Sequence, residues 1–376
     1  MNRSVEFFLL SYYTDPSMIG SLRARHWFEH LKVMGFCSHL ISPIEYANKN
    51  PRFSVLKKFV SVRDFFKINS FLFEIQNLQF FKFFQSARLL VLSSGSERKV
   101  VISSYGPFVT ILVGFILKKC DAGIYWVIDY RDDWSSNYKK QNWLRALDKY
   151  VERRLTKYAD LLITVSEPYA HTIAKNILRD VQVVMNGFDG RFYGESPLGF
   201  DSGSTQCVIT YTGSLNKWRP GIVEFLESFV AAANIRMDVE LHIYGRIQDI
   251  DSKIFEHNSI KLMGAVDHCE MAQIQMMSDY LLFFDTGVPG ELSGKIFEYM
   301  ASGRPILFWE PECGDSGVRT LLSSSHALID VPRSISDIIE LVLSLKKTVR
   351  VEPSASILQF SRQSQVEHLV DLIWQH

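Results

Sequence analysis

The chain has few of the features that mark secreted, repetitive or disordered proteins. Its five cysteines are far apart among the 376 residues and form no Cys-x-x-Cys pair. This spacing argues against a disulfide framework or a zinc site and favours a reducing cytosol. The sequence has no repeat of fixed period and no Gly-, Ser- or Gln-rich tract. With 47% hydrophobic and 22% charged residues, it is typical of a globular protein.

Long apolar runs are also missing. The longest uncharged stretch, residues 100–117, is interrupted by Gly106 and Pro107. We interpret it as a strand, a turn and a buried helix that begins at the proline, not as a membrane span. The run Val5–Leu10 is broken by Glu6 and is followed by no small-residue cleavage site, so we expect no signal peptide.

Two further absences concern cofactors and charge. No Gly-x-Gly-x-x-Gly motif follows the first apolar run, which argues against an ordinary dehydrogenase. The net charge is zero. However, residues 1–199 contain 27 basic and 18 acidic residues, a net charge of +9, and residues 200–376 contain 14 and 23, a net charge of −9. This split predicts two units with different surroundings.

Short apolar runs alternate with helical patterns along the chain, which is typical of a parallel α/β fold. Strands are expected at 5–11, 37–42, 100–103, 124–130, 161–165, 182–185, 207–212, 239–244, 260–263, 280–284, 305–309 and 327–331. Helices are expected at 22–34, 108–119, 142–158, 167–178, 219–233, 270–277, 294–302, 335–347 and 356–374. Because residues 194–204 are rich in Gly, Ser and Pro, they are interpreted as a linker. We predict two Rossmann-like, doubly wound domains, residues 1–195 and 205–355, whose ligand sites face a shared cleft.

Two segments of the second half have the pattern of a phosphate site. In 210–221, TYTGSLNKWRPG, small residues follow a strand and precede a helix, and Lys217 and Arg219 add positive charge. In 290–305, GELSGKIFEYMASGRP, Lys295 lies in the first turn of a helix, where a phosphate would bind. Glu298, on the same face, can accept hydrogen bonds from two ribose hydroxyls. The alternatives are an ordinary loop and a surface Lys–Glu pair.

Together these segments resemble the GT-B glycosyltransferases of the family-4-like group, over nearly the whole chain. The matching segments are DYRDDW (129–134), ADLLITVSE (159–167), MNGFD (185–189), YTGSLNKWRPG (211–221), LHIYG (241–245), MSDYLLFF (277–284) and GKIFEYMASGRPIL (294–307). The resemblance implies that the C-terminal domain binds a nucleotide-sugar, UDP- or GDP-linked, and that the N-terminal domain binds the acceptor. It also implies that a final helix, within residues 356–376, packs back on the N-terminal domain.

The resemblance implies a set of donor-binding residues in the loops after the strands. They are Gly20, Gly213, Ser214, Lys217, Arg219, Gly245, Gly264, Val266, Glu291, Leu292, Ser293, Gly294, Lys295 and Glu298. In the family two glutamates are often separated by seven residues, whereas Glu291 and Glu298 are separated by six. The contact of Glu291 with the sugar is therefore in question.

Carboxylates follow the strand that ends in DYRDDW, so they are expected at the cleft. Asp129 and Asp132 are candidates for binding or activating the acceptor. The alternatives are structural: Asp129 would cap a helix, and Asp132 would pair with Arg131 or a nearby lysine. Arg23, Tyr105 and Gly106 are the other acceptor-binding candidates.

We expect no metal or other cofactor. Positive groups on the diphosphate would stabilise the leaving group, and the resemblance implies that they replace a divalent cation. The one Asp-x-Asp, Asp249 to Asp251, is interpreted as a helix cap.

A segment at residues 53–84 contains ten of the 27 phenylalanines together with five basic residues. This composition favours peripheral contact with anionic lipid at the cytoplasmic face of the inner membrane, with part of the phenylalanines, in 80–90, forming a core helix. No nucleic-acid motif accompanies the segment, so we expect no nucleic-acid partner.

The sequence thus predicts a metal-independent glycosyltransferase that transfers a sugar to a glycan or lipid-linked acceptor of a surface polysaccharide such as capsule or O-antigen. The resemblance favours retention of configuration. Two alternatives stay open: a nucleotide-sugar 2-epimerase on the same fold, and a non-catalytic GT-B scaffold protein.

Overall fold

The computed structural model describes residues 5–14, 19–42, 78–132, 134–135, 142–194, 205–288, 290–312, 317–323 and 328–375. The chain divides into two compact units. The N-terminal unit comprises Met1–Met185 with Val366–His376, and the C-terminal unit comprises Asn186–Gln365. Residues 53–77 of the Phe-rich segment and residues 195–204 of the expected linker lie outside the described residues.

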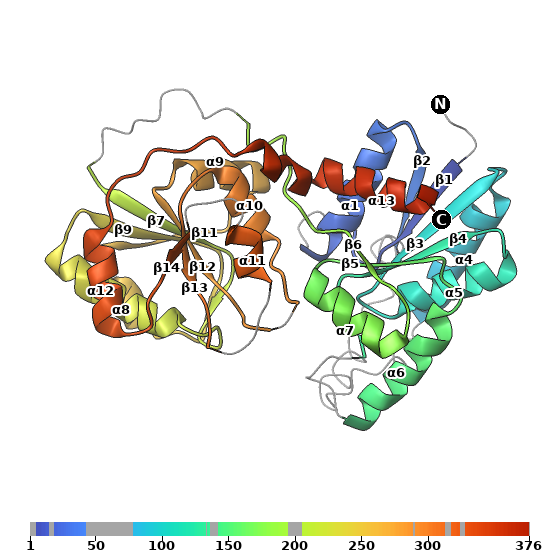
Figure 1. The fold of residues 1–376 in the computed structure, drawn as a ribbon, viewed down its shortest axis with the longest axis horizontal. Coiled ribbons are helices and arrows are strands. Elements are labelled where there is room, and N and C mark those ends of the chain that lie inside the picture. Colours follow the sequence, from blue (N-terminus) through green and yellow to red (C-terminus); the bar gives the residue numbers. More distant parts are fainter. Residues whose placement is uncertain are drawn as a thin grey trace. The chain divides into compact units, whose positions relative to one another are not determined.

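A parallel six-stranded sheet forms the centre of the N-terminal unit (Figure 1). Its strands are β1 (Val5–Leu10), β2 (Cys37–Ile41), β3 (Arg98–Ser104), β4 (Tyr125–Tyr130), β5 (Leu161–Thr164) and β6 (Gln182–Val183), in the order β2-β1-β3-β4-β5-β6. The strands are mostly apolar on both faces, as expected for a sheet that helices cover on both sides. In β1, for example, the adjacent Phe7 and Phe8 are both fully buried, one in each of two core clusters.

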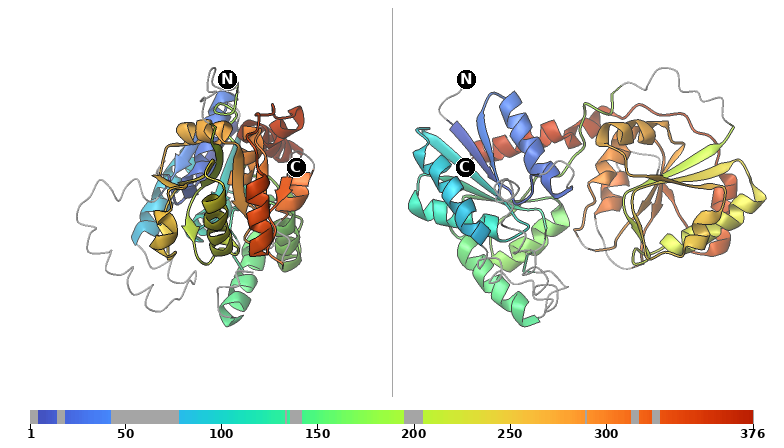
Figure 2. Two further views of the ribbon diagram at one scale, coloured as in Figure 1. Left: turned by 90° about the vertical axis from the view of Figure 1, so that its left-hand side faces the viewer. Right: turned by 180° about the vertical axis from the view of Figure 1, so that it is seen from behind.

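Helices cover the two faces of this sheet. They are α1 (Ile19–Val33), α4 (Leu78–Ser93), α5 (Val109–Cys120), α6 (Asn142–Thr156), α7 (Glu167–Ile177) and the greater part of α13 (Arg362–Gln375). The cluster on one face joins α1 and α13, with Trp27 and Leu369 buried in it. The cluster on the other face joins α4 and α5, with Phe83 and Val113 buried in it. Figure 2 shows these two groups of helices on either side of the sheet.

The C-terminal unit repeats this design with six parallel strands. They are β7 (Cys207–Thr212), β9 (Val239–Tyr244), β11 (Ile260–Gly264), β12 (Tyr280–Phe284), β13 (Ile306–Trp309) and β14 (Leu328–Asp330), in the order β11-β9-β7-β12-β13-β14. The two-residue strands β8 (Leu215–Asn216) and β10 (Ile247–Gln248) form a separate small ladder.

The helical elements of the C-terminal unit also lie in two layers. They are α8 (Ile222–Ile235), the 3₁₀ turn η2 (Ser252–Glu256), α9 (His268–Met277), α10 (Lys295–Ser302), α11 (Val318–Ser323), α12 (Ile335–Ser344) and the 3₁₀ turn η3 (Ala355–Phe360). Helices α8 and α12 share one core cluster with the sheet, in which Phe225, Phe229 and Ile338 are fully buried. Helix α10 packs with α9 and η3 (Figure 1).

The predicted fold class, two doubly wound parallel domains with a last helix that returns to the first, is confirmed. The expected helix at 356–374 consists of two pieces, because the backbone is extended at Ser361, between η3 and α13. From Val366 onward α13 belongs to the core of the N-terminal unit, where Arg98 donates to the Ile373 carbonyl (2.8 Å). Among the described helices, none combines the length and the apolarity that crossing a bilayer would demand.

Candidate functional site

The strand order of the C-terminal unit places the two predicted phosphate segments side by side. The chain reverses its winding direction between β7 and β12, which are neighbours in the sheet. In open α/β sheets ligands bind at this point, beyond the carboxyl ends of the strands. Gly213 and Ser214 follow β7 directly, and the segment 290–295 follows β12.

Two cations cross this point in opposite directions. Lys295, at the start of α10, donates from Nζ to the carbonyl of Thr212 at the end of β7, over 2.6 Å. Arg219, from the loop after β7, donates from Nη1 to the carbonyl of Phe284 at the end of β12, over 2.9 Å. Both positive charges are therefore held at the carboxyl ends of the two central strands.

The glycines of this edge are required by close contacts. A Cβ on Gly213 would lie 2.4 Å from the Lys295 Nζ, and the φ of Gly213 is +109°. A Cβ on Gly245, which has a φ of +143° and follows β9, would lie 2.2 Å from the Gly213 carbonyl oxygen. Side chains at either position would be strained and would fill the space over the strand ends.

The buried face of α10 is apolar, and its packing fixes the positions of Lys295 and Glu298 on the helix. Ile296, Phe297 and Met300 are fully buried, and the Tyr299 hydroxyl accepts from the backbone N–H of Thr212 (3.1 Å). The ammonium of Lys295 is thereby drawn out of water. Burial and, secondly, the charge of Arg219 lower the pKa of Lys295 to about 7.

Arg362 lies between the carboxylates of Glu298 and Asp189. Arg362, the first residue of α13, places Nη2 3.7 Å from Glu298 Oε1 and Nη1 4.0 Å from Asp189 Oδ2. The Arg362 N–H also donates to the Phe188 carbonyl (2.8 Å), which fixes the segment after β6 against the start of α13. Sequence reasoning missed Arg362, since nothing near it in the chain indicates a ligand site.

The other predicted donor residues differ in their surroundings. Ser214 and Lys217 are exposed, and Lys217 lies over the ring of Trp218 (4.8 Å). Leu292 is buried, Ser293 and Gly294 are half-buried at the start of α10, and Glu291 is exposed.

Two of the predicted donor residues lie farther along the sheet. Gly264, with a φ of +75°, is the last residue of β11, and Val266 follows that strand. In the sheet β11 is separated from β7 by β9. Among the predicted donor residues of this unit, these two therefore lie farthest along the sheet from Lys295 and Arg219.

The N-terminal unit has its own reversal, between β1 and β3. Just beyond it, Asp129 of β4 and Arg23 of α1 form a buried pair, with Nε and Nη2 of the arginine 3.0–3.2 Å from the two carboxylate oxygens. Ser104 also donates to Asp129 (2.9 Å), and Arg23 donates to the carbonyls of Val184 and Met185. Both side chains are nearly inaccessible to solvent.

This burial bears on two expectations. Asp129 is not placed to take a proton from an acceptor, because its oxygens are occupied by Arg23 and Ser104. Arg23 is likewise engaged by protein groups and does not present its guanidinium to a ligand. The pair joins α1 to the sheet, a structural role that differs from the helix cap given above as the alternative for Asp129. Burial also lowers the pKa of Arg23, an effect that the charge of Asp129 opposes.

Asp132 is the accessible carboxylate of the predicted pair, with a side chain that is 62% exposed. Arg131 lies between it and the first turn of α1, where Gly20 is found: Nη1 donates to the Gly20 carbonyl and Nη2 lies 3.4 Å from Asp132 Oδ2. A Cβ on Gly106 would lie 2.9 Å from that same oxygen. Gly20, Gly106 and Asp132 therefore come together at one edge of the sheet.

Tyr105 and the two aspartates of the Asp-x-Asp sequence have structural contacts of their own. The Tyr105 ring stacks on Trp134, with centroids 5.6 Å apart. Asp251 caps η2 by accepting from the Lys253 N–H (3.0 Å), so its expected role as a cap is confirmed. Asp249 precedes it with a φ of +59°.

No protein-family model matches the chain, and no curated protein matches it by sequence. Solved structures do match. HepE from Anabaena, in complex with UDP and glucose, superposes with a TM-score of 0.63 at 14% identity, covering 99% of this chain and 100% of that one. The sucrose-phosphate synthase of Thermosynechococcus elongatus gives 0.62 at 14% identity, covering 98% of both chains. A trehalose-6-phosphate protein from E. coli, bound with UDP-2-fluoro glucose, gives 0.62 at 12% identity, covering 99% of both.

These matches extend over whole chains and establish the fold as GT-B, in agreement with the strand orders described above. At such low identity they establish the fold alone.

Proposed function

We propose that the protein is a glycosyltransferase that transfers a sugar from a nucleotide-sugar to a glycan or lipid-linked acceptor. The observation that carries the proposal is the crossing of Lys295 and Arg219 at the strand reversal of the C-terminal unit. The UDP and UDP-sugar ligands of HepE and of the E. coli protein support a UDP-linked donor.

The diphosphate of the donor would lie over Gly213, against the start of α10. The space there depends on the missing side chain of Gly213, and the N-terminus of a helix favours an anion. Lys295 and Arg219 now donate to backbone carbonyls and would turn toward the phosphate oxygens. A bound diphosphate would compensate the buried ammonium and so favour its charged form.

Glu298 would bind the ribose hydroxyls of the nucleotide. It lies one turn after Lys295 on α10, so one helix would hold both the phosphate and the ribose. Arg362 contacts the Glu298 carboxylate at 3.7 Å and would act as a positioning residue for it. This contact would also make the nucleotide site sensitive to the start of α13.

The chemistry requires stabilisation of a departing nucleoside diphosphate. Cleavage of the anomeric bond leaves an oxocarbenium-like sugar and places negative charge on the phosphate that Lys295 and Arg219 would hold. Preorganised cations of this kind lower the barrier without a metal ion, and we propose a metal-independent, retaining reaction. In the N-terminal unit Asp132, exposed beside Gly106, is the carboxylate that we propose to bind or orient an acceptor hydroxyl.

We further propose that the acceptor belongs to a surface polysaccharide such as capsule or O-antigen, and that the protein works at the cytoplasmic face of the membrane. Helix α4 supports a lipid-facing surface, since Phe81 and Leu89 are each 63% exposed although the opposite side of the helix is buried. Such amphipathic, aromatic surfaces bind at the level of the lipid headgroups.

A thermal-shift panel of nucleoside diphosphates and nucleotide-sugars tests the donor site. A nucleotide at about 100 times its dissociation constant stabilises the folded state by about 2.7 kcal/mol, which raises the melting temperature by about 5–10 °C for a unit of this size. UDP should shift the native protein and the control Glu340→Ala, which changes an exposed residue of α12, but should shift Glu298→Ala much less. No shift with any nucleotide would contradict the proposal and favour a scaffold protein.

Product analysis separates the transferase from the epimerase. A transferase consumes the UDP-sugar at an appreciable rate only with acceptor and releases UDP. A 2-epimerase would instead convert the UDP-sugar to its epimer without any acceptor, and that result would replace the transferase assignment.

A further inference from the structure

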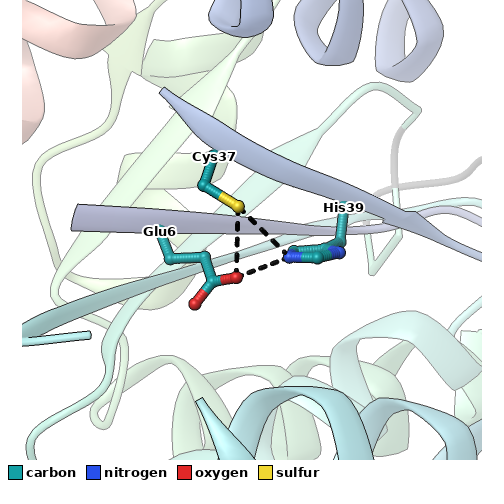
Figure 3. Close-up of side chains that lie close together, drawn as sticks. All are labelled: Glu6, Cys37 and His39. Carbon is teal, nitrogen blue, oxygen red and sulfur yellow. Dashed lines mark hydrogen bonds and ion pairs between the residues drawn. The ribbon is translucent and has the colours of Figure 1, made fainter. Parts of the chain in front are cut away.

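A group of three metal-ligating side chains lies in the N-terminal unit, away from the loops discussed above. Glu6 of β1 and Cys37 and His39 of β2 point to the same face of the sheet, because Glu6 pairs with Cys37 and Phe8 with His39 in the parallel register. The distances between the ligand atoms are 3.3 Å from Cys37 Sγ to Glu6 Oε1, 3.6 Å from Sγ to His39 Nε2, and 2.5 Å from Nε2 to Oε1 (Figure 3).

A catalytic triad would give a different arrangement. In a Cys–His–acid triad the thiol and the carboxylate contact different ring nitrogens of the histidine. Here both the Cys37 sulfur and the Glu6 oxygen lie against the same nitrogen, Nε2. Three donor atoms that converge on one point are the arrangement in which a single ion can bind all of them.

We propose that Glu6, Cys37 and His39 bind a Zn²⁺ ion, with water or another small ligand in the fourth position. Tetrahedral Zn²⁺, with bonds of about 2.0–2.3 Å, separates its nitrogen, oxygen and sulfur ligands by about 3.3–3.6 Å. The two distances to the sulfur already have this length. The third pair of atoms has to move apart by roughly 0.8 Å, which small side-chain rotations supply. A thiolate with an imidazole favours Zn²⁺ over Mg²⁺ or Ca²⁺, which prefer oxygen ligands.

The surroundings of Glu6 match those of a metal-ligating carboxylate. Ser94 and Ser96, which follow α4, both donate to the other carboxylate oxygen, Oε2, the latter over 2.9 Å. Oε1 is thus directed toward Cys37 and His39. The His39 ring is stacked on Phe8, with centroids 5.1 Å apart. Hydrogen bonds and packing of this kind hold ligands in orientation, and their loss lowers metal affinity by roughly 10- to 100-fold.

The position in the sheet indicates a role apart from sugar transfer. Glu6 and Cys37 lie at the amino ends of β1 and β2, whereas Gly20, Gly106 and Asp132 follow the carboxyl ends of strands. An ion here would fasten the edge strand β2 to β1 and, through the two serines, to the end of α4. The spacing of the cysteines in the sequence does not show this site, because its ligands come from two strands and include a single cysteine.

Titration of the purified, metal-free full-length protein with Co²⁺ and then Zn²⁺ tests the proposal. One equivalent of Co²⁺ should give the strong visible bands of a tetrahedral ion and a thiolate charge-transfer band in the near ultraviolet, and Zn²⁺ should displace them. Cys37→Ser should lose the thiolate band, and Ser96→Ala should weaken Co²⁺ binding by roughly 10- to 100-fold. Cys269→Ser, which removes an exposed thiol from the C-terminal unit, should behave like the native protein.

Melting temperatures show whether a loss of metal binding in Cys37→Ser reflects a lost ligand or an unfolded variant. The metal-free melting temperature of Cys37→Ser should equal that of the native protein, because Cys37 is exposed, and Zn²⁺ should raise only that of the native protein. If Co²⁺ gives no thiolate band, or if the band persists in Cys37→Ser, the proposal is overturned. It is also overturned if His39→Gln binds Co²⁺ with native affinity and spectrum.

Discussion

The affinity of the protein for UDP is expected to fall steeply as the pH rises above 7, because Lys295 loses its charge there. Burial and the neighbouring Arg219 lower the pKa of this lysine to about 7 in the empty site. A bound diphosphate would provide the counter-charge and hold the lysine as a cation. Nucleotide binding then takes up a proton, so the affinity depends on the pH through that proton.

The expected change in the dissociation constant for UDP with pH follows from the pKa of Lys295. With a pKa of about 7, about half of the free protein has a charged lysine at pH 7 and about 1% at pH 9. If only the charged form binds the diphosphate, the dissociation constant increases about 50-fold between these values, equivalent to about 2.3 kcal/mol. UDP itself contributes little, because the last phosphate ionisation, with a pKa of about 6, is nearly complete at pH 7.

Isothermal titration calorimetry with UDP, in two buffers of different ionisation enthalpy, measures both the affinity and the protons taken up. We expect uptake of about 0.5 proton at pH 7 and about 0.9 at pH 8. The matched control is Lys295→Arg, which stays charged throughout and should show no such slope. A native affinity that does not change between pH 7 and 9, or an equal slope in Lys295→Arg, would refute the assignment of Lys295 to the diphosphate.

Two further predictions concern substitutions at Gly213 in the C-terminal unit and at Asp129 in the N-terminal unit. Gly213→Ala should weaken UDP binding strongly in the same calorimeter, because alanine rarely adopts a φ of +109° and its Cβ would displace the Lys295 side chain, whereas Gly190→Ala, in open space, should bind normally. Near-native affinity in Gly213→Ala would contradict the proposed diphosphate position. Asp129→Asn should cost about 3–5 kcal/mol in urea unfolding because it leaves Arg23 buried without a counter-charge, and the exposed Asp132→Asn should cost less than about 1 kcal/mol. Equal losses in these two variants would contradict the structural role of the buried pair.

The strands were the most predictable part of the fold, for a physical reason. A parallel strand covered on both faces is a largely apolar run, so β7 and β12 have the bounds that the sequence predicts. Strand β9 has its predicted bounds as well, although Glu240 and His242 alternate with its apolar residues. The short ladder of β8 and β10 could not be predicted, because two-residue strands are defined by their pairing and have no pattern of their own. The break between η3 and α13 was missed because no proline or glycine in residues 356–374 marks it.

The candidate site could be predicted only where its residues share an element. Lys295 and Glu298 lie on one helix, so their spacing in the sequence indicates that they share a face. Arg23 and Asp129 were each predicted at the site, but their pairing across 106 positions depends on how α1 packs on β4. The same holds for Arg362, which reaches Glu298 only through the return of the chain after η3.

The two strand reversals differ in how their cations are compensated, and this difference supports the division of labour proposed above. In the N-terminal unit Arg23 is paired with Asp129 at 3.0 Å, and Arg131 lies 3.4 Å from Asp132. In the C-terminal unit Lys295 and Arg219 donate to backbone carbonyls, which carry no net charge. An anionic ligand gains most where basic groups have no carboxylate partner, since the ligand then supplies the counter-charge that the protein does not. A diphosphate is therefore expected at the reversal between β7 and β12, and an uncharged acceptor hydroxyl at the neutralised reversal between β1 and β3.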